Sequence, residues 1–137
     1  MKGLKPDGIL DAIDVNPEVI QALEDTIRKA ELQGRIKIHW GRALDVLPRM
    51  EGPYDMVFID ANKDKYPEYL GEALRLTRPG SVILAHNMFM SLPARRGEKT
   101  PGVRGIAEYT KRIFNDSRLS SLIVPLGDGL AISFRTA

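Results

Sequence analysis

Two patterns of hydrophobic and polar residues alternate along the chain. Short apolar runs predict strands at 8–15, 36–40, 54–60, 81–86, 119–124 and 130–134. Between several of them, apolar residues recur at spacings of three and four, which predicts helices at 17–32, 43–50, 67–77 and 103–115. The Arg-Pro-Gly segment at 78–80 predicts a turn, and the segment 88–102, rich in prolines and glycines, predicts a mobile loop.

Alternating strands and helices are typical of a parallel α/β sheet. We therefore expect an α/β fold whose sheet is mostly parallel and carries helices on both faces. The short link at 125–129 predicts that the last two strands form an antiparallel hairpin. A length of 137 residues fits one domain, so the expected domain covers residues 1–137.

Composition narrows the class of protein. Hydrophobic residues make up 43% and charged residues 28%, as in ordinary globular proteins. No apolar run reaches the ~18 residues of a membrane span, and the first residues lack a signal-peptide pattern, so we expect a cytoplasmic protein without a membrane partner. The absence of cysteine excludes disulfides and thiolate chemistry. A net charge of +2 indicates no general attraction to nucleic acid.

Polar residues stand at the ends of three predicted strands. Asp14 ends the first strand, Asp60 the third, and His86 with Asn87 the fourth. Because ligands bind beyond the carboxyl ends of parallel strands, these ends are expected to converge on one crevice. Asp14 is suited to accept the two hydroxyls of a ribose, or else it simply caps its strand.

The group of Asp60, His86 and Asn87 offers a carboxylate, an imidazole and an amide oxygen. Such a set can bind a divalent metal, or it can be a polar cluster that satisfies the strand ends. Lys63, three residues after Asp60, is a candidate general base if its surroundings lower its pKa, and otherwise a solvated lysine.

Two further groups carry weaker signals. His39 and Trp40 end the second strand, where half-buried residues are ordinary. Four basic residues suit a bound phosphate or are simply solvated: Arg95, Arg96, Lys99 and Arg104. They are the basis of a nucleic-acid interpretation, which is the least favoured.

Several motifs, in order along nearly the whole chain, resemble the S-adenosylmethionine (SAM)-dependent O-methyltransferases of the catechol and caffeoyl-CoA type. The segment 12–18 (AIDVNPE) resembles the second-strand motif of that family, and 41–44 (GRAL) resembles the segment that flanks adenine. The most specific match is 54–66 (YDMVFIDANKDKY). The segments 78–87 and 125–130 (PLGDGL) resemble the next strand and the closing hairpin.

This resemblance implies roles for individual residues. Asp14 would bind the ribose of the cofactor, and Lys63 would be the catalytic residue that helps to deprotonate the acceptor hydroxyl. The cofactor-binding residues would be Asp14, Gly41, Arg42, Ala43 and Asp60. The metal ligands would be Asp60, His86 and Asn87.

Two departures from the family pattern change these expectations. The family's N-terminal helices, first strand and Gly-rich cofactor loop have no counterpart here, so we expect SAM binding to be weak or absent. The strands at 8–15 and 54–60 would then lack the neighbour between them, and should pair directly or be buried between chains. His86 stands where the family has an aspartate ligand, so Mg²⁺ binding should weaken, and either a softer ion such as Mn²⁺ or Zn²⁺ or no metal at all is expected.

The resemblance implies a Rossmann-like methyltransferase sheet with an antiparallel C-terminal strand. The implied function is metal-assisted transfer of a methyl group from SAM to a phenolic or catechol-type hydroxyl of a small molecule, acyl-CoA-type substrates included. The alternative is a non-catalytic family remnant that acts as a binding or dimerising module. We expect a homodimer and no nucleic-acid partner.

Overall fold

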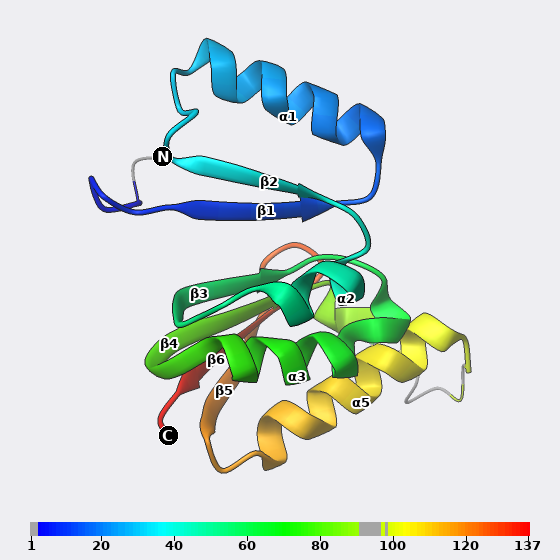
Figure 1. Ribbon diagram of the computed structural model, residues 1–137. Coiled ribbons are helices and arrows are strands. Elements are labelled where there is room, and N and C mark those ends of the chain that lie inside the picture. The colour runs from blue at the N-terminus through cyan, green and yellow to red at the C-terminus, as the bar shows by residue number, and fades with distance from the viewer. Residues whose placement is uncertain (1–2, 91–96, 98) are drawn as a thin grey trace. The chain divides into compact units, whose positions relative to one another are not determined.

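The structure is a computed structural model, and it describes residues 3–90, 97 and 99–137. The chain divides into two compact units, Met1–Met50 and Glu51–Ala137, which are described separately. Figure 1 shows the elements of both units. Among the described residues, no helix is long and apolar enough to cross a membrane.

The first unit is built on a pair of parallel strands, β1 (Leu10–Asp14) and β2 (Ile36–Trp40), joined by helix α1 (Pro17–Lys29). Asn16 begins the helix because its side-chain oxygen accepts the N–H of Glu18 at 2.9 Å. The apolar side of α1 buries Ile20 and Ile27. A short helix, α2 (Ala43–Val46), and a 3₁₀ turn, η1 (Leu47–Arg49), complete the unit.

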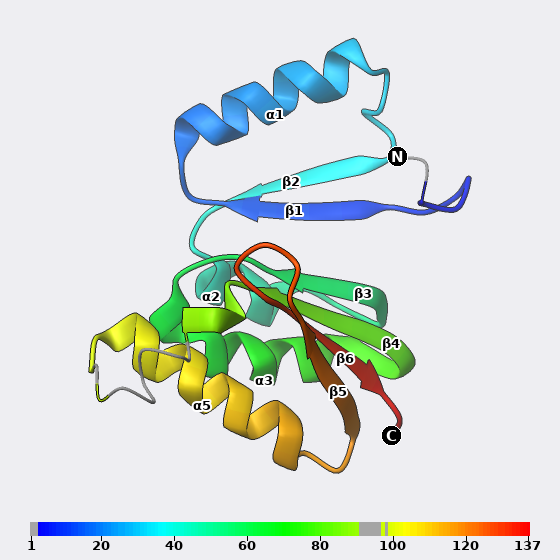
Figure 2. The same cartoon turned by 180° about the vertical axis from the view of Figure 1, so that it is seen from behind.

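The second unit is a four-stranded sheet in the order β3-β4-β6-β5. Strands β3 and β4 are parallel, and β6 is antiparallel to both β4 and β5, so the predicted combination of parallel strands with an antiparallel C-terminal hairpin is confirmed. The strands are β3 (Tyr54–Ile59), β4 (Thr77–His86), β5 (Leu119–Val124) and β6 (Leu130–Arg135). Figure 2 shows the β5–β6 hairpin from behind.

Two helices, α3 (Tyr66–Leu76) and α5 (Pro101–Asn115), pack against each other and cover one face of this sheet (Figure 1). Short 3₁₀ turns, η2 (Lys63–Lys65) and η3 (Met88–Met90), follow β3 and β4. The core under the helices contains Ile83, Ile106, Tyr109 and Ile113, each 0% exposed. This packing supports the ends of β3 and β4, where the predicted catalytic residue and metal ligands lie.

Three predictions about local structure are wrong or altered. The turn expected at 78–80 is part of strand β4, and the pairing register of β4 with β3 shifts between Tyr54 and Met56. The expected direct pairing of the strands at 8–15 and 54–60 is not among the strand pairings of the described residues, and the alternative, burial between chains, stays a prediction. The expected loop at 88–102 begins with η3 and ends in α5, while 91–96 and 98 lie outside the described residues.

Candidate functional site

In the first unit, the predicted cofactor-binding residues gather where β1 and β2 end. The Asp14 carboxylate accepts the backbone N–H of Asn16 at 2.8 Å. The N–H of Gly41 donates to the backbone oxygen of Asp14 at 2.9 Å, which joins the two segments directly. The φ of Gly41 is +156°, a value that side-chain-bearing residues rarely adopt. Arg42 lies 3.8 Å from Asp45 at the surface.

Trp40 is 70% exposed, so the expectation that it is half-buried is wrong. Its indole N–H donates to the backbone oxygen of Val15 at 3.3 Å. His39 behaves as expected for a half-buried residue, with a ring nitrogen 2.7 Å from a carboxylate oxygen of Asp11. Trp40 is therefore a surface residue beside the predicted cofactor site.

In the second unit, the parallel pairing of β3 and β4 brings Asp60 and His86 together beyond the strand ends. A ring nitrogen of His86 lies 3.6 Å from one carboxylate oxygen of Asp60. The Lys63 ammonium donates to the other carboxylate oxygen at 2.7 Å. The same ammonium donates to the hydroxyl of Tyr66 at 2.9 Å. The hydroxyl of Tyr66 donates in turn to the backbone oxygens of Ile59 and His86, at 3.2 and 3.1 Å.

These contacts shift the pKa values of the three titrating groups. The hydrogen bond from Lys63 lowers the pKa of Asp60 below its usual value. Burial alone would lower the pKa of Lys63, but the hydrogen bonds to Asp60 and Tyr66 outweigh burial and raise it. Burial raises the pKa of Tyr66. At neutral pH, Lys63 is therefore a charged ammonium whose side chain is only 18% exposed.

Asn87 directs its amide nitrogen to a different partner, Asp128 in the β5–β6 hairpin, at 3.2 Å. Backbone bonds join the same two segments, because the N–H groups of Met88 and Phe89 donate to the oxygens of Gly129 and Asp128 at 3.1 and 2.9 Å. The hairpin thereby fixes the chain that follows β4.

The described side chains do not fit a hard divalent cation such as Mg²⁺. Among them, no group of three or more His, Cys, Asp or Glu residues could hold a metal ion. Asp60 is the single carboxylate of the predicted set, and its two oxygens already face the Lys63 ammonium and the His86 ring. Mg²⁺ and Ca²⁺ sites are usually built from several oxygen ligands, with carboxylates foremost.

Two residues of this cluster were missed from the sequence. Tyr66 stands three residues after Lys63 at the start of a helix, a spacing that could have indicated a contact. Asp128 lies in the hairpin motif, and nothing in its local sequence points to Asn87.

Of the four basic residues considered for a phosphate, Arg95 and Arg96 lie outside the described residues, and the guanidinium of Arg104 donates to the backbone oxygen of Lys99 at 2.8 Å.

Comparison with known proteins gives a consistent result. The model of a family described as O-methyltransferase matches residues 1–136. The "Probable O-methyltransferase" of Mycobacterium tuberculosis is 36% identical over 142 residues, which cover 98% of this chain and 62% of that protein. The chain thus spans less than two thirds of the length of this relative.

Two solved structures show the same fold. The O-methyltransferase TomG of Streptomyces achromogenes, involved in tomaymycin synthesis and solved with SAM, is 29% identical with a TM-score of 0.88, covering 99% of this chain and 66% of that one. An O-methyltransferase of Bacillus cereus, solved with S-adenosylhomocysteine (SAH), is 27% identical with a TM-score of 0.90, covering 98% and 66%. The expected Rossmann-like methyltransferase fold is confirmed.

Proposed function

This chain belongs to the O-methyltransferase family, and on that premise we propose that it takes part in methyl transfer from SAM to a phenolic or catechol-type hydroxyl of a small molecule. Support comes from relatives solved with SAM and SAH and from the polar groups at the strand ends of each unit. Because the chain spans only part of its relatives, the activity of the whole protein is itself part of the proposal.

In the proposed reaction, Asp14 binds the ribose hydroxyls of the cofactor through its carboxylate. One carboxylate oxygen is held by the N–H of Asn16, which fixes the orientation of the side chain. Gly41 keeps the neighbouring backbone close to Asp14 and leaves room for the base, and Arg42 and Ala43 continue this surface. When bound, SAM supplies an electrophilic methyl group on a sulfonium centre.

The observation that carries the proposal is the ammonium of Lys63, which is largely buried at the end of β3 and held by Asp60 and Tyr66. As its raised pKa keeps it charged, it cannot itself accept the hydroxyl proton, which passes to water; the ammonium stabilises the negative charge that develops on the acceptor oxygen. With SAM bound, the acceptor oxygen would take the methyl group as the carbon–sulfur bond breaks, and SAH would be left as the second product. No step of this scheme needs a metal ion.

The test is a methyl-transfer assay by mass spectrometry, with SAM and a panel of catechols and hydroxycinnamoyl compounds. Lys63→Met should reduce the rate by about a hundredfold, the usual effect of losing one group that stabilises an oxyanion. Lys65→Met, on the same 3₁₀ turn and 41% exposed, should leave it unchanged. An excess of chelator should have no effect on the wild-type rate. A wild-type chain that methylates no compound of the panel, or a fully active Lys63→Met variant, would contradict the proposal.

A second candidate, the dimerising module, is favoured by the open face of the four-stranded sheet. The strand register places Met56, Phe58, Leu122 and Phe134 on one face, and their exposed fractions lie between 47% and 59%. Exposed apolar patches of this kind often mark interaction surfaces. Light scattering on the purified chain tests the expected homodimer, and a monomer at all concentrations would exclude it.

A further inference from the structure

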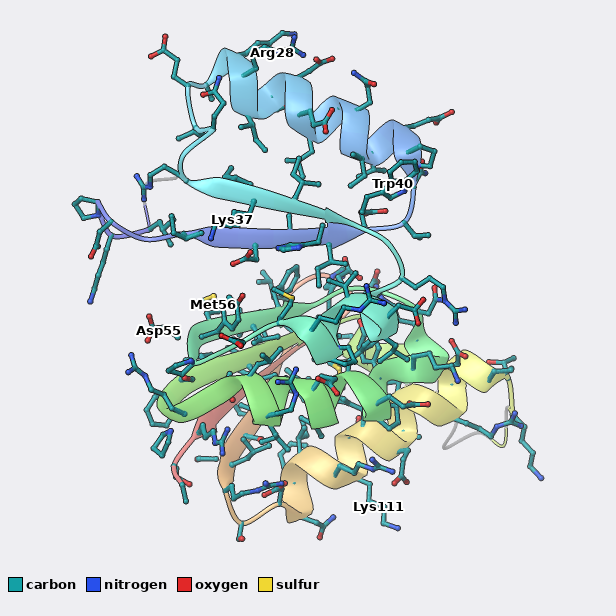
Figure 3. The ribbon with its side chains drawn as sticks, viewed as in Figure 1. Arg28, Lys37, Trp40, Asp55, Met56 and Lys111 are labelled. Atoms are coloured by element: carbon teal, nitrogen blue, oxygen red, sulfur yellow. The ribbon has the colours of Figure 1, made fainter. Side chains whose placement is uncertain are left out.

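Trp40 and Asp14 are paired residues at the ends of two neighbouring strands. Paired residues of a parallel ladder project from the same face, and the strands are about 4.8 Å apart. The indole therefore stands next to the carboxylate that is proposed to hold the ribose. Figure 3 shows Trp40 at the end of β2, beside the start of α1.

The indole is held at its edge while most of its surface stays open to solvent. Its N–H donates to the backbone oxygen of Val15, between β1 and α1, at 3.3 Å, and that bond restrains the orientation of the ring. Among the described large apolar side chains, Trp40 is the most exposed at 70%, and Val15 beside it is 60% exposed. An oriented, uncovered aromatic ring next to a ribose-binding carboxylate is a ready stacking partner for a base.

We propose that Trp40 is a binding residue for the adenine ring of the cofactor. The inference rests on the proposed function, because it takes Asp14 as the ribose partner. With the ribose on Asp14, the attached base would be within reach of the indole on the neighbouring strand, and contact with the ring would remove apolar surface of both from water. Hydrogen bonding by Asp14 is specific for the sugar, while Trp40 contributes contact with the base.

The chain contains a single tryptophan, so its fluorescence reports this position alone. We would titrate the wild-type chain with SAH, adenosine and homocysteine, exciting at the red edge of the indole band, where adenine does not absorb. SAH and adenosine should each change the fluorescence in a saturable manner. Homocysteine, which lacks the base, should leave it unchanged.

Calorimetry with SAH provides the affinity. Trp40→Leu should weaken binding by about three- to tenfold, the usual worth of one aromatic stacking contact, and Trp40→Phe should retain most of the affinity. Phe114→Leu, which removes a 54% exposed aromatic ring from the second unit, is the matched control and should bind like wild type. Thermal unfolding of each variant shows whether it is folded.

The outcomes separate this inference from the proposed function. If SAH binds by calorimetry while the fluorescence stays constant, or if Trp40→Leu binds as tightly as wild type, the role of Trp40 is refuted and the proposed function stands. If homocysteine changes the fluorescence as much as SAH does, the base is not the contact. If the wild-type chain binds no SAH at all, both proposals fail for this chain. Should Trp40→Leu not fold, the wild-type titrations and the Trp40→Phe affinity decide.

Discussion

Two buried tyrosines of the second unit differ in the hydrogen bonding of their hydroxyls, and replacing each by phenylalanine should give opposite results. Both are 0% exposed, and their rings pack edge to face with centroids 5.5 Å apart. The hydroxyl of Tyr66 accepts a bond from Lys63 and donates to two backbone oxygens. The hydroxyl of Tyr109 has no hydrogen-bond partner among the described residues, and burial raises its pKa.

The magnitudes follow from these contacts. A hydrogen bond to a charged group contributes about 1.5–3 kcal/mol and a neutral one about 0.5–1.5 kcal/mol. Lys63 keeps its bond to Asp60 when the Tyr66 hydroxyl is removed, so Tyr66→Phe should destabilise the unit by about 2 kcal/mol. The hydroxyl of Tyr109 loses its hydrogen bonds to water on folding and gains none in their place. Tyr109→Phe should therefore stabilise the unit by up to about 1 kcal/mol.

Urea unfolding followed by far-ultraviolet circular dichroism measures both free energies. The fluorescence of Trp40 is not a substitute, because that residue lies in the first unit. The two variants should differ by about 3 kcal/mol in the free energy of unfolding of the second unit. If both variants unfold like wild type, the Lys63–Tyr66 bond contributes nothing to stability. If Tyr109→Phe is the more destabilised of the two, its hydroxyl has a partner and the reasoning is wrong.

Three further predictions concern other parts of the chain. A Cβ on Gly105 would overlap the backbone of η2, so Gly105→Ala should lower the free energy of unfolding by about 3 kcal/mol. Gly71 has open space around it, so Gly71→Ala should stabilise α3 by about 0.5–1 kcal/mol. Urea unfolding measures both changes. The guanidinium of Arg118 lowers the pKa of Asp116 to about 2, so the carboxylate stabilises the fold above its ordinary pKa of 3.8. Asp116→Asn should therefore be less stable by about 1 kcal/mol at neutral pH, and in acid titrations of stability the difference should vanish as pH falls through about 2. His86→Asp places two carboxylates at the strand ends, so Mg²⁺ should raise the melting temperature of this variant and leave that of wild type unchanged; a variant without any Mg²⁺ response would show that charge is not what limits the site.

The hydrophobic pattern was sufficient to predict the elements and their order. Strand and helix periods are local properties of the chain, and β2 and β5 have the bounds that the apolar runs predict. The juxtaposition of Asp60 and His86 was also predictable, because parallel neighbouring strands end at the same edge.

Other features depend on three-dimensional packing and were not predictable. The Arg-Pro-Gly segment has the sequence pattern of a turn, but in the structure it is part of strand β4, whose pairing register with β3 shifts at this place. The raised pKa of Lys63 depends in part on its hydrogen bond to the Tyr66 hydroxyl, which the fold of η2 and α3 brings within 2.9 Å of the ammonium. An exposed Trp40 has the same local sequence pattern as a half-buried one, since exposure depends on what packs beside the end of β2.

The central claim is that Asp14 holds the cofactor, and SAH binding to two matched variants tests it most directly. Calorimetry would compare the wild-type chain with Asp14→Asn, which keeps the shape of the side chain and removes its charge. Asp25→Asn, on an exposed side chain of α1, is the control in the same unit. The account predicts binding at least tenfold weaker for Asp14→Asn and unchanged for Asp25→Asn. Equal affinity of wild type and Asp14→Asn would contradict it.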